Sequence, residues 1–286
     1  MPKIVIIGGG PAGLSAAIYA SRANLETTVL YTDGGALGKT DKIENYFGFP
    51  EAVSGAELLA RGQAQAKRLG AALVQAEATG IEYAEAGFVV KSTAGVFPAD
   101  AVILATGAPR AVPPVAGVAE FEGRGVSYCA VCDAFFYRGK AAAVLGQGEY
   151  ALEEARVLLP VAGSVTLLTN GSEAPAQLPD GLAVDTRPVA AIEGGDKVAQ
   201  VAFAAGDPLA VDGVFIAYGT AGSSDFARKL GAQLDGNKIQ ADGAMATAVP
   251  GLFAAGDCTG GLLQVAKAVS DGAQAALSAM RFVRQQ

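Results

Sequence analysis

Two cysteines spaced three residues apart, Cys129 and Cys132, are followed directly by Asp133. Thiols at this spacing can close a small disulfide ring and reopen it. Exchange with another disulfide needs an attacking thiolate and a proton source for the leaving sulfur. The chain contains no histidine, so Asp133 is the nearest candidate for that proton source. The sequence therefore predicts a catalytic dithiol of Cys129 and Cys132, with Asp133 as its acid.

Other interpretations of this segment are weaker. Paired cysteines often form half of a zinc site, but zinc would need two further ligands. Only Cys258 remains as a third cysteine, so we predict no metal. A purely structural disulfide is a second alternative, and it is uncommon outside secreted proteins. Asp133 itself could serve only as a turn former or helix cap.

The composition restricts the classes of function. The chain has 286 residues, 51% of them hydrophobic, with 38 glycines and a net charge of −7. This acidic balance argues against nonspecific binding to nucleic acid or to anionic membranes. Met1-Pro2-Lys3 runs directly into an apolar strand, and no apolar run approaches the ~20 residues of a membrane span. With only three cysteines, we expect a cytoplasmic protein.

The order strand, glycine turn, helix and strand occurs twice. The first copy starts at Lys3–Ile7 and Gly8–Gly13, and the second at Ala141–Leu145 and Gly146–Ala151. In both copies the next strand begins 19 residues after the first glycine (27 − 8 and 165 − 146). This is the opening of a dinucleotide-binding βαβ unit, in which a pyrophosphate lies on the helix N-terminus. Two copies in matching contexts are much stronger evidence than one.

The two copies differ at the end of the second strand. Asp33 follows that strand in the first copy, where an acid can bind a ribose hydroxyl. Thr169-Asn170-Gly171 stands there in the second copy. This segment offers neither an acid for a 2′-hydroxyl nor an arginine for a 2′-phosphate. The second nucleotide site is therefore expected to be poor.

Together with these elements, several further motifs resemble those of the low-molecular-weight thioredoxin reductases, over nearly the whole chain. The motifs that carry the resemblance are Gly34-Gly35-Ala36-Leu37, Glu44-Asn45-Tyr46, Ala105-Thr106-Gly107, Gly123-Arg124-Gly125-Val126-Ser127, Phe135-Phe136-Tyr137-Arg138 and Gly251-Leu252-Phe253-Ala254-Ala255-Gly256-Asp257.

The resemblance implies bound FAD and thioredoxin as the partner. Cys132 would lie against the flavin and Cys129 would attack the thioredoxin disulfide. Arg124, Phe135 and Phe136 would dock the partner, although an aromatic pair is as often part of a core. The family is typically homodimeric. The residues that would hold FAD are Gly8, Gly10, Pro11, Ala12, Gly13, Asp33, Gly35, Leu37, Asn45, Thr106, Gly107, Gly256, Asp257, Gln264 and Val265.

The chain departs from the family pattern at the second nucleotide site. Members that use NADPH carry a His-Arg-Arg cluster where this chain has Thr169-Asn170-Gly171, and Glu173 would repel a 2′-phosphate. NADP is therefore an unlikely cofactor. On the flavin side, Ala36 replaces a glutamine and Gln264-Val265 replaces an Arg-Gln pair. This combination resembles the subgroup that takes electrons from ferredoxin.

The predicted fold is α/β, with two Rossmann-like, three-layer ββα domains. A discontinuous FAD domain would comprise residues 1–112 and 243–286, and a second domain, 113–242, would be inserted and carry the cysteines. The segment Pro109–Gly117 with three prolines reads as a linker. Helices are expected from Ser54 to near Gly70 and from Leu263 to Val283.

Four functions fit these expectations. The leading one is a thioredoxin reductase fed by ferredoxin. The alternatives are a reductase that uses NAD(P)H, a dithiol oxidase that uses oxygen, and a flavin-binding redox sensor without enzymatic activity.

Overall fold

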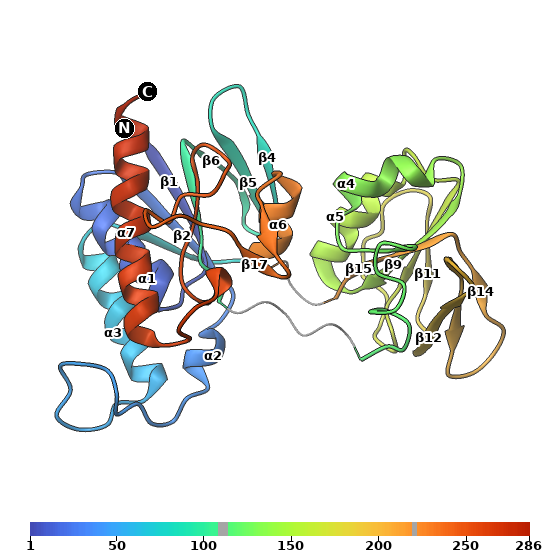
Figure 1. Cartoon of the computed structure of the whole chain (residues 1–286), viewed down its shortest axis with the longest axis horizontal. Helices are drawn as coiled ribbons and strands as arrows, with labels where there is room; N and C mark the ends of the chain where they lie inside the picture. Colours follow the sequence, from blue (N-terminus) through green and yellow to red (C-terminus); the bar gives the residue numbers. More distant parts are fainter. Residues whose placement is uncertain (108–113, 219–221) are drawn as a thin grey trace. The chain divides into compact units, whose positions relative to one another are not determined.

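The computed structural model describes residues 1–107, 114–218 and 222–286 (Figure 1). The chain divides into two compact units. Unit 1 comprises Met1–Arg110 and Gly222–Gln286, and unit 2 comprises Ala111–Ala221. Both ends of the chain therefore build one unit and the middle builds the other. The predicted linker lies outside the described residues at positions 109–113.

The second boundary differs from the prediction. Unit 1 resumes at Gly222, whereas the sequence placed the change after residue 242. The reason is helix α6 (Ser223–Lys229), whose Phe226 is fully buried. The Tyr83 hydroxyl also donates to the Leu230 carbonyl oxygen at 2.6 Å. Residues 222–242 thus pack onto unit 1.

A five-stranded parallel sheet forms the centre of unit 1. Its order is β18-β7-β1-β2-β3, and every neighbouring pair is parallel. Strand β1 is buried almost throughout because layers cover both faces of the sheet (Figure 1). Helices lie on one face and a three-stranded antiparallel sheet, β4-β5-β6, on the other. The strands of the two sheets are β1 (Lys3–Ile7), β2 (Glu26–Tyr31), β3 (Ala72–Gln75), β7 (Ala101–Leu104), β18 (Leu252–Ala254), β4 (Ala78–Tyr83), β5 (Phe88–Ser92) and β6 (Gly95–Ala99).

Small residues bring the first and last long helices of unit 1 into close contact. A Cβ on Gly272 would lie 2.0 Å from the Ala12 carbonyl oxygen, so the α1 and α7 backbones approach there as only glycine permits. The core of the unit includes alanines from both helices, among them Ala16 and Ala275. The remaining elements of unit 1 are α1 (Pro11–Arg22), α2 (Gly35–Gly38), α3 (Gly55–Arg68), β16 (Leu234–Asp235), β17 (Lys238–Ile239), the 3-10 turn η2 (Asp257–Thr259) and α7 (Val265–Arg284).

Unit 2 repeats this architecture. Its parallel sheet has the order β11-β10-β9-β15-β8, and a second, antiparallel sheet has the order β12-β13-β14. Side chains of the two sheets share one core, in which Val201 and Phe203 lie among Leu145 and Ile216. The elements are β8 (Val126–Ser127), α4 (Ala130–Asp133), the 3-10 turn η1 (Ala134–Tyr137), β9 (Ala141–Gly146), α5 (Gly148–Leu158), β10 (Ser164–Leu168), β11 (Leu182–Asp185), β12 (Val189–Gly194), β13 (Val198–Phe203), β14 (Leu209–Ala210) and β15 (Gly213–Ala217).

The predicted fold class is confirmed. Both βαβ openings form as expected, and α3 begins after Ser54, whose hydroxyl oxygen accepts a hydrogen bond from the Glu57 amide at 3.1 Å. The predicted C-terminal helix is α7. Among the described residues, no helix is long and apolar enough to span a bilayer.

Candidate active site: a disulfide at the start of a short helix

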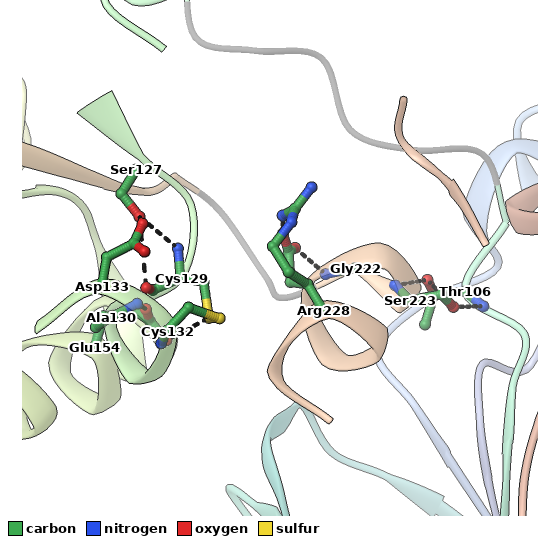
Figure 2. Close-up of polar contacts among 11 residues, drawn as sticks. Thr106, Ser127, Cys129, Ala130, Cys132, Asp133, Glu154, Gly222, Ser223 and Arg228 are labelled. Carbon is green, nitrogen blue, oxygen red and sulfur yellow. Dashed lines mark hydrogen bonds and ion pairs between the residues drawn. A yellow bond between two sulfur atoms is a disulfide. The ribbon is translucent and has the colours of Figure 1, made fainter. Parts of the chain in front are cut away.

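Cys129 and Cys132 are joined by a disulfide, with their Cα atoms 5.3 Å apart (Figure 2). Cys129 is the N-cap of α4, and its sulfur accepts a hydrogen bond from the Cys132 amide at 3.2 Å. A helical turn places residues i and i+3 side by side, so the short α4 sets the spacing that the ring requires. The predicted dithiol pair is therefore assembled by its own local structure.

The two sulfurs differ in exposure. Cys129 is buried, with 1% of its surface accessible, whereas Cys132 is exposed. The sequence-based assignment gave Cys129 the outward position from which it would attack a bulky partner. Burial of Cys129 beneath the α4 turn does not suit that role, and the accessible residue of the pair is Cys132.

Asp133 belongs to a hydrogen-bonded group around the disulfide. The Ser127 hydroxyl donates to the Asp133 carboxylate at 2.7 Å, and the Ser127 oxygen accepts from the Cys129 amide at 3.1 Å. Ser127 is buried at the end of β8. It therefore ties the candidate acid to the backbone of the first cysteine. The sequence contained Ser127 within a motif but gave it no role.

Tyr137 is a titratable group near Asp133. Burial raises the pKa of the Tyr137 hydroxyl, and the nearby carboxylates of Asp133 and Asp212 raise it further. The hydroxyl points to the Gly125 carbonyl at 3.4 Å, and the ring packs edge-on against Phe215. Tyr137 thus stays neutral at physiological pH.

Glu154 is a residue of the site that sequence reasoning missed. It is 1% exposed, and its carboxylate accepts from the Ala130 amide at 2.7 Å (Figure 2). A signal was available, because Tyr150, Glu154 and Leu158 lie four residues apart on α5. An acid within an otherwise apolar helix face is expected to be buried against a specific partner.

The residues predicted to dock a partner fall into two groups. Phe135 and Phe136 are 69% and 66% exposed, so they are not part of a core. Val131 is exposed beside them, between the two cysteines. Arg124 instead donates to the backbone carbonyls of Glu120 and Asp196, at 2.6 and 3.4 Å.

In unit 1, the first glycine turn has the form that a dinucleotide requires. Gly8 adopts φ +121°, and a Cβ there would lie 2.1 Å from the Ala105 carbonyl oxygen. Gly10 is the N-cap of α1, with no side-chain cap and open space on its Cβ side, and Pro11 starts the helix. Gly13 must lack a Cβ, which would lie 1.8 Å from the Gly8 oxygen. The turn and the uncapped amides fit a pyrophosphate.

The late motif lies against this turn. A Cβ on Gly256 would lie 2.9 Å from the Ala12 Cβ, and the Gly256 amide donates to Asp271 at 3.1 Å. Burial raises the pKa of Asp257, Lys267 opposes that shift and Asp271 adds to it. The first and last motifs of the chain thus meet at one end of the sheet, as FAD binding would require.

The other predicted FAD residues lie in loops of the same unit. The Asp33 carboxylate, just after β2, accepts from the Gly35 amide at 2.8 Å, and Leu37 follows in α2. The Asn45 side chain donates to Gln264 at 2.8 Å. Gln264 is the N-cap of α7 and Val265 its first residue. The predicted FAD residues all belong to unit 1, and the disulfide-bonded pair Cys129 and Cys132 belongs to unit 2.

Thr106 and Ser223 bind each other reciprocally. Their hydroxyls are 2.8 Å apart, the Thr106 amide donates to the Ser223 oxygen at 3.0 Å, and the Ser223 amide donates to the Thr106 oxygen at 2.7 Å (Figure 2). This pair fastens the start of α6 to the segment that holds Gly107. It joins positions 117 residues apart in the sequence.

In unit 2, the residues that follow β10 form hydrogen bonds with neighbouring residues of the same unit. The Thr169 hydroxyl donates to the Ser172 carbonyl at 2.5 Å, and the Asn170 oxygen accepts from the Val189 amide at 2.8 Å. Arg187 holds Asp185 through several hydrogen bonds of 2.6 to 3.1 Å. Its guanidinium carbon also lies 3.8 Å from the centre of the Phe203 ring.

Two basic residues of unit 1 that an acidic protein could contact are already paired with acidic side chains. Lys42 pairs with Glu44 at 2.8 Å, and Arg61 pairs with Glu57 at 2.6 Å. No cluster of three or more potential metal ligands occurs within residues 1–107, 114–218 and 222–286.

The third cysteine is inert by its surroundings. Cys258 is free and buried, and its thiol lies 3.3 Å from the Ala255 carbonyl oxygen. Burial raises the pKa of the Cys258 thiol to about 11, although a hydrogen bond with Ser223 opposes the shift. Cys258 is therefore a buried thiol of low reactivity.

Two dinucleotide-type units, one of which carries a paired disulfide, define a class of two-domain disulfide oxidoreductases. The sequence matches the pyridine nucleotide-disulphide oxidoreductase family over residues 2–272. The chain belongs to that family.

Its relatives within the family are thioredoxin reductases. One from Aquifex aeolicus is 37% identical over 299 residues, which cover 98% of this chain and 93% of the relative. Among solved structures, the atypical thioredoxin reductase TRi from Desulfovibrio vulgaris Hildenborough is 41% identical to this chain. The alignment covers 100% of this chain and 99% of that protein, with a TM-score of 0.93. A ferredoxin-flavin thioredoxin reductase from Clostridium acetobutylicum is 31% identical, covers 99% and 98%, and has a TM-score of 0.72. Recognition of the family from the motifs is confirmed.

Proposed function

We propose that the protein is a thioredoxin reductase that passes an electron pair from bound FAD, through Cys129 and Cys132, to the disulfide of thioredoxin. The observation that carries this proposal is the disulfide itself, with one accessible residue, Cys132, beside the exposed rings of Phe135 and Phe136. An apolar patch next to a reactive sulfur suits a protein substrate. The activity is tested by following thioredoxin reduction with the holoenzyme and chemically reduced flavin.

The residues of unit 1 suit FAD. The open Gly10 position and the uncapped N-terminus of α1 would receive the pyrophosphate, and Asp33 would bind a ribose hydroxyl. Asp257, Gln264 and Val265 would lie toward the rest of the cofactor. When bound, FAD supplies a carrier that can accept electrons singly and release them in pairs.

The chain's own residues perform the disulfide chemistry. Two electrons and two protons convert the Cys129–Cys132 disulfide into two thiols. One thiolate then attacks the thioredoxin disulfide, which forms a mixed disulfide and releases one thioredoxin thiol. The second protein thiolate breaks that mixed disulfide, which restores the Cys129–Cys132 bond and releases the second thioredoxin thiol.

The exposure of Cys132 supports it as the attacking sulfur, with Cys129 as the resolving one. Access to the attacking thiol limits such exchange reactions, and Cys129 is buried. The variant Cys129→Ser is expected to accumulate a mixed disulfide with thioredoxin, detected by mass spectrometry. The matched variant Cys132→Ser should accumulate none. The opposite result would return the attacking role to Cys129.

Asp133 is the proposed proton source for the leaving sulfur, held in place by Ser127. Loss of a general acid commonly costs about 10²-fold or more in rate. We expect Asp133→Asn to slow single-turnover reduction of thioredoxin by about that factor. Ser127→Ala should slow it by about tenfold, since one hydrogen bond to a charged group contributes roughly 1.5 kcal/mol. If both variants match the parent, the acid lies elsewhere.

We propose ferredoxin, rather than NADPH, as the electron donor. The strand end that would receive a 2′-phosphate has its polar groups engaged locally, and Arg187 is held by Asp185. Glu149 stands in the first turn of α5, where a pyrophosphate would lie. An acid there repels phosphate. Among the relatives, one is described as a ferredoxin-flavin enzyme.

An anaerobic titration of the flavin spectrum tests the donor. Reduced ferredoxin is expected to bleach the flavin, while micromolar NADPH or NADH should leave it yellow. Bleaching by micromolar NADPH would refute this part of the proposal while leaving the thioredoxin reductase activity intact. From the resemblance we also propose a homodimer located in the cytoplasm, for which sedimentation and fractionation are the direct measurements.

A further inference from the structure

The buried acid Glu154 lies directly behind the redox disulfide. Its carboxylate comes from α5, the helix of the nucleotide-type βαβ unit, and binds the Ala130 amide at 2.7 Å. Ala130 is covalently next to Cys129 and is itself fully buried. The hydrogen bond therefore connects α5 of the βαβ unit with α4, which carries the cysteine pair (Figure 2).

Three amides around the disulfide are each bound by a specific acceptor. The Cys129 amide binds the Ser127 oxygen at 3.1 Å, the Ala130 amide binds Glu154, and the Cys132 amide binds the Cys129 sulfur at 3.2 Å. Of these three acceptors, only Glu154 is a carboxyl side chain, and it is shielded from solvent. An ionised group in a buried site interacts with its neighbours more strongly than one in water.

We propose that Glu154 is a positioning residue that holds the first turn of α4 and sets the dithiol–disulfide equilibrium of Cys129 and Cys132. The inference rests on the proposed function of this cysteine pair. Reduction creates thiol groups, and the Cys132 amide favours negative charge on the Cys129 sulfur. The Glu154 carboxylate opposes that charge. It therefore favours the disulfide and makes the reduced pair a stronger electron donor toward thioredoxin.

The chain offers a matched control on the same helix. Glu153 is adjacent to Glu154, but its carboxylate pairs with Arg156 at 2.7 Å, and its side chain is 24% exposed. Glu154→Gln and Glu153→Gln remove the same charge from consecutive positions. Glutamine at 154 retains an oxygen that can accept from the Ala130 amide, so the turn keeps its hydrogen bond.

The experiment equilibrates the holoenzyme with glutathione at pH 8 and counts thiols by alkylation and mass spectrometry. In this reaction the protein disulfide and two glutathione molecules form the protein dithiol and one glutathione disulfide. We expect Glu154→Gln to shift the equilibrium toward the dithiol by about tenfold, or about 30 mV for a two-electron couple. Glu153→Gln should stay within about twofold of the parent, since the Glu153 carboxylate is partly exposed and already paired with Arg156, and such solvent-screened ion pairs contribute little.

The outcomes are distinct. An equal equilibrium constant for the parent and Glu154→Gln would overturn the proposal, as would an equal shift in Glu153→Gln. If Glu154→Gln does not fold, Glu154→Asp and Glu154→Met provide the comparison. The charged variant should stay near the parent equilibrium and the neutral one should shift toward the dithiol, and two equal values would overturn the proposal. Because glutathione replaces both thioredoxin and ferredoxin, failure of the proposed function would leave this measurement valid.

Discussion

The two βαβ units of the chain share a topology but differ in their nucleotide chemistry. In unit 1, α1 begins without an acidic residue in its first turn, after the open position of Gly10. In unit 2, α5 begins with Glu149, which pairs with Arg156 at 2.6 Å. The strand that follows leads into Asp33 in unit 1 and into the internally bonded Thr169 and Asn170 in unit 2.

The comparison shows that one topology can carry different polar residues at the end of its second strand. The unit 2 sheet and α5 still form, because their apolar residues are buried as in unit 1. Helix α5 also supports α4, because Glu154 of α5 binds the Ala130 amide.

The largest expected effect concerns the last residue of each turn, which is Gly13 in unit 1 and Ala151 in unit 2. Gly13→Ala places a Cβ 1.8 Å from the Gly8 oxygen, so the turn must open. We expect at least about tenfold less flavin per protein, since the phosphate lies on this turn. The converse change, Ala151→Gly, should retain flavin and cost only about 1 kcal/mol of stability. The ratio of flavin to protein absorbance measures the first effect and urea unfolding the second.

Equal flavin content in Gly13→Ala and the parent would contradict the assignment of unit 1 as the FAD unit. Loss of flavin in Ala151→Gly instead would exchange the two assignments.

The second effect is a difference in alkylation rate between Cys258 of unit 1 and Cys132 of unit 2. With its pKa raised to about 11, Cys258 has little thiolate at pH 8. The fully reduced protein should therefore alkylate at Cys258 at least about a hundredfold more slowly than at Cys132, because the thiolate is the reactive form. The rate at Cys258 should rise as the pH approaches 11. Peptide mapping after timed alkylation measures both rates, and comparable rates at pH 8 would contradict the prediction.

A third change would make unit 2 resemble a nucleotide site again. The double variant Ser172→Arg with Glu173→Arg adds two guanidinium groups after β10 and removes a repelling acid. The Ser172 backbone carbonyl keeps its bond from Thr169. We expect NADPH to reduce the flavin about tenfold or more faster, as one good charged contact contributes roughly 1.5 to 3 kcal/mol. The uncharged double variant with glutamine at both positions is the control, and equal rates in the two variants would contradict this explanation.

The smallest expected effect is a change of stability with pH at Asp185, which pairs with Leu168 at the end of β10. Hydrogen bonds from Arg187 hold the pKa of Asp185 below its usual value of 3.8. A lowered pKa contributes stability above the usual value, and that stability is lost as the pH falls through the folded-state pKa. Asp185→Asn should therefore be less stable than the parent at pH 7, with the difference shrinking below about pH 3.8. Urea unfolding at several pH values measures this, and a difference that grows in acid would contradict it.

Local patterns were enough to predict both βαβ openings and the dithiol. Strand, turn and helix signals lie within about 30 residues of each other, as for Lys3–Tyr31. The antiparallel sheets β4-β5-β6 and β12-β13-β14 were only partly anticipated, because their pairing depends on non-local contacts. The boundary at Gly222 was missed for the same reason, since it is set by contacts of Tyr83 and Thr106 with the α6 region.

The limits for the site were similar. The sequence predicted Cys129, Cys132 and Asp133 as site residues, with Cys129 as the outward thiol. In the structure Cys129 is buried and Cys132 is exposed, because exposure depends on how α4 packs. The backbone partners of Ser127 and Glu154 were missed, since an amide carries no sequence signal, although the apolar face of α5 indicated that Glu154 is buried.

The reciprocal bonds of Thr106 and Ser223 have a consequence for how this protein can change over time. They hold the exit and the return of the inserted segment at one place on unit 1. A loop whose ends are already neighbours can be exchanged at a small entropic cost. The fold of unit 1 can therefore persist when the sequence of the inserted unit changes.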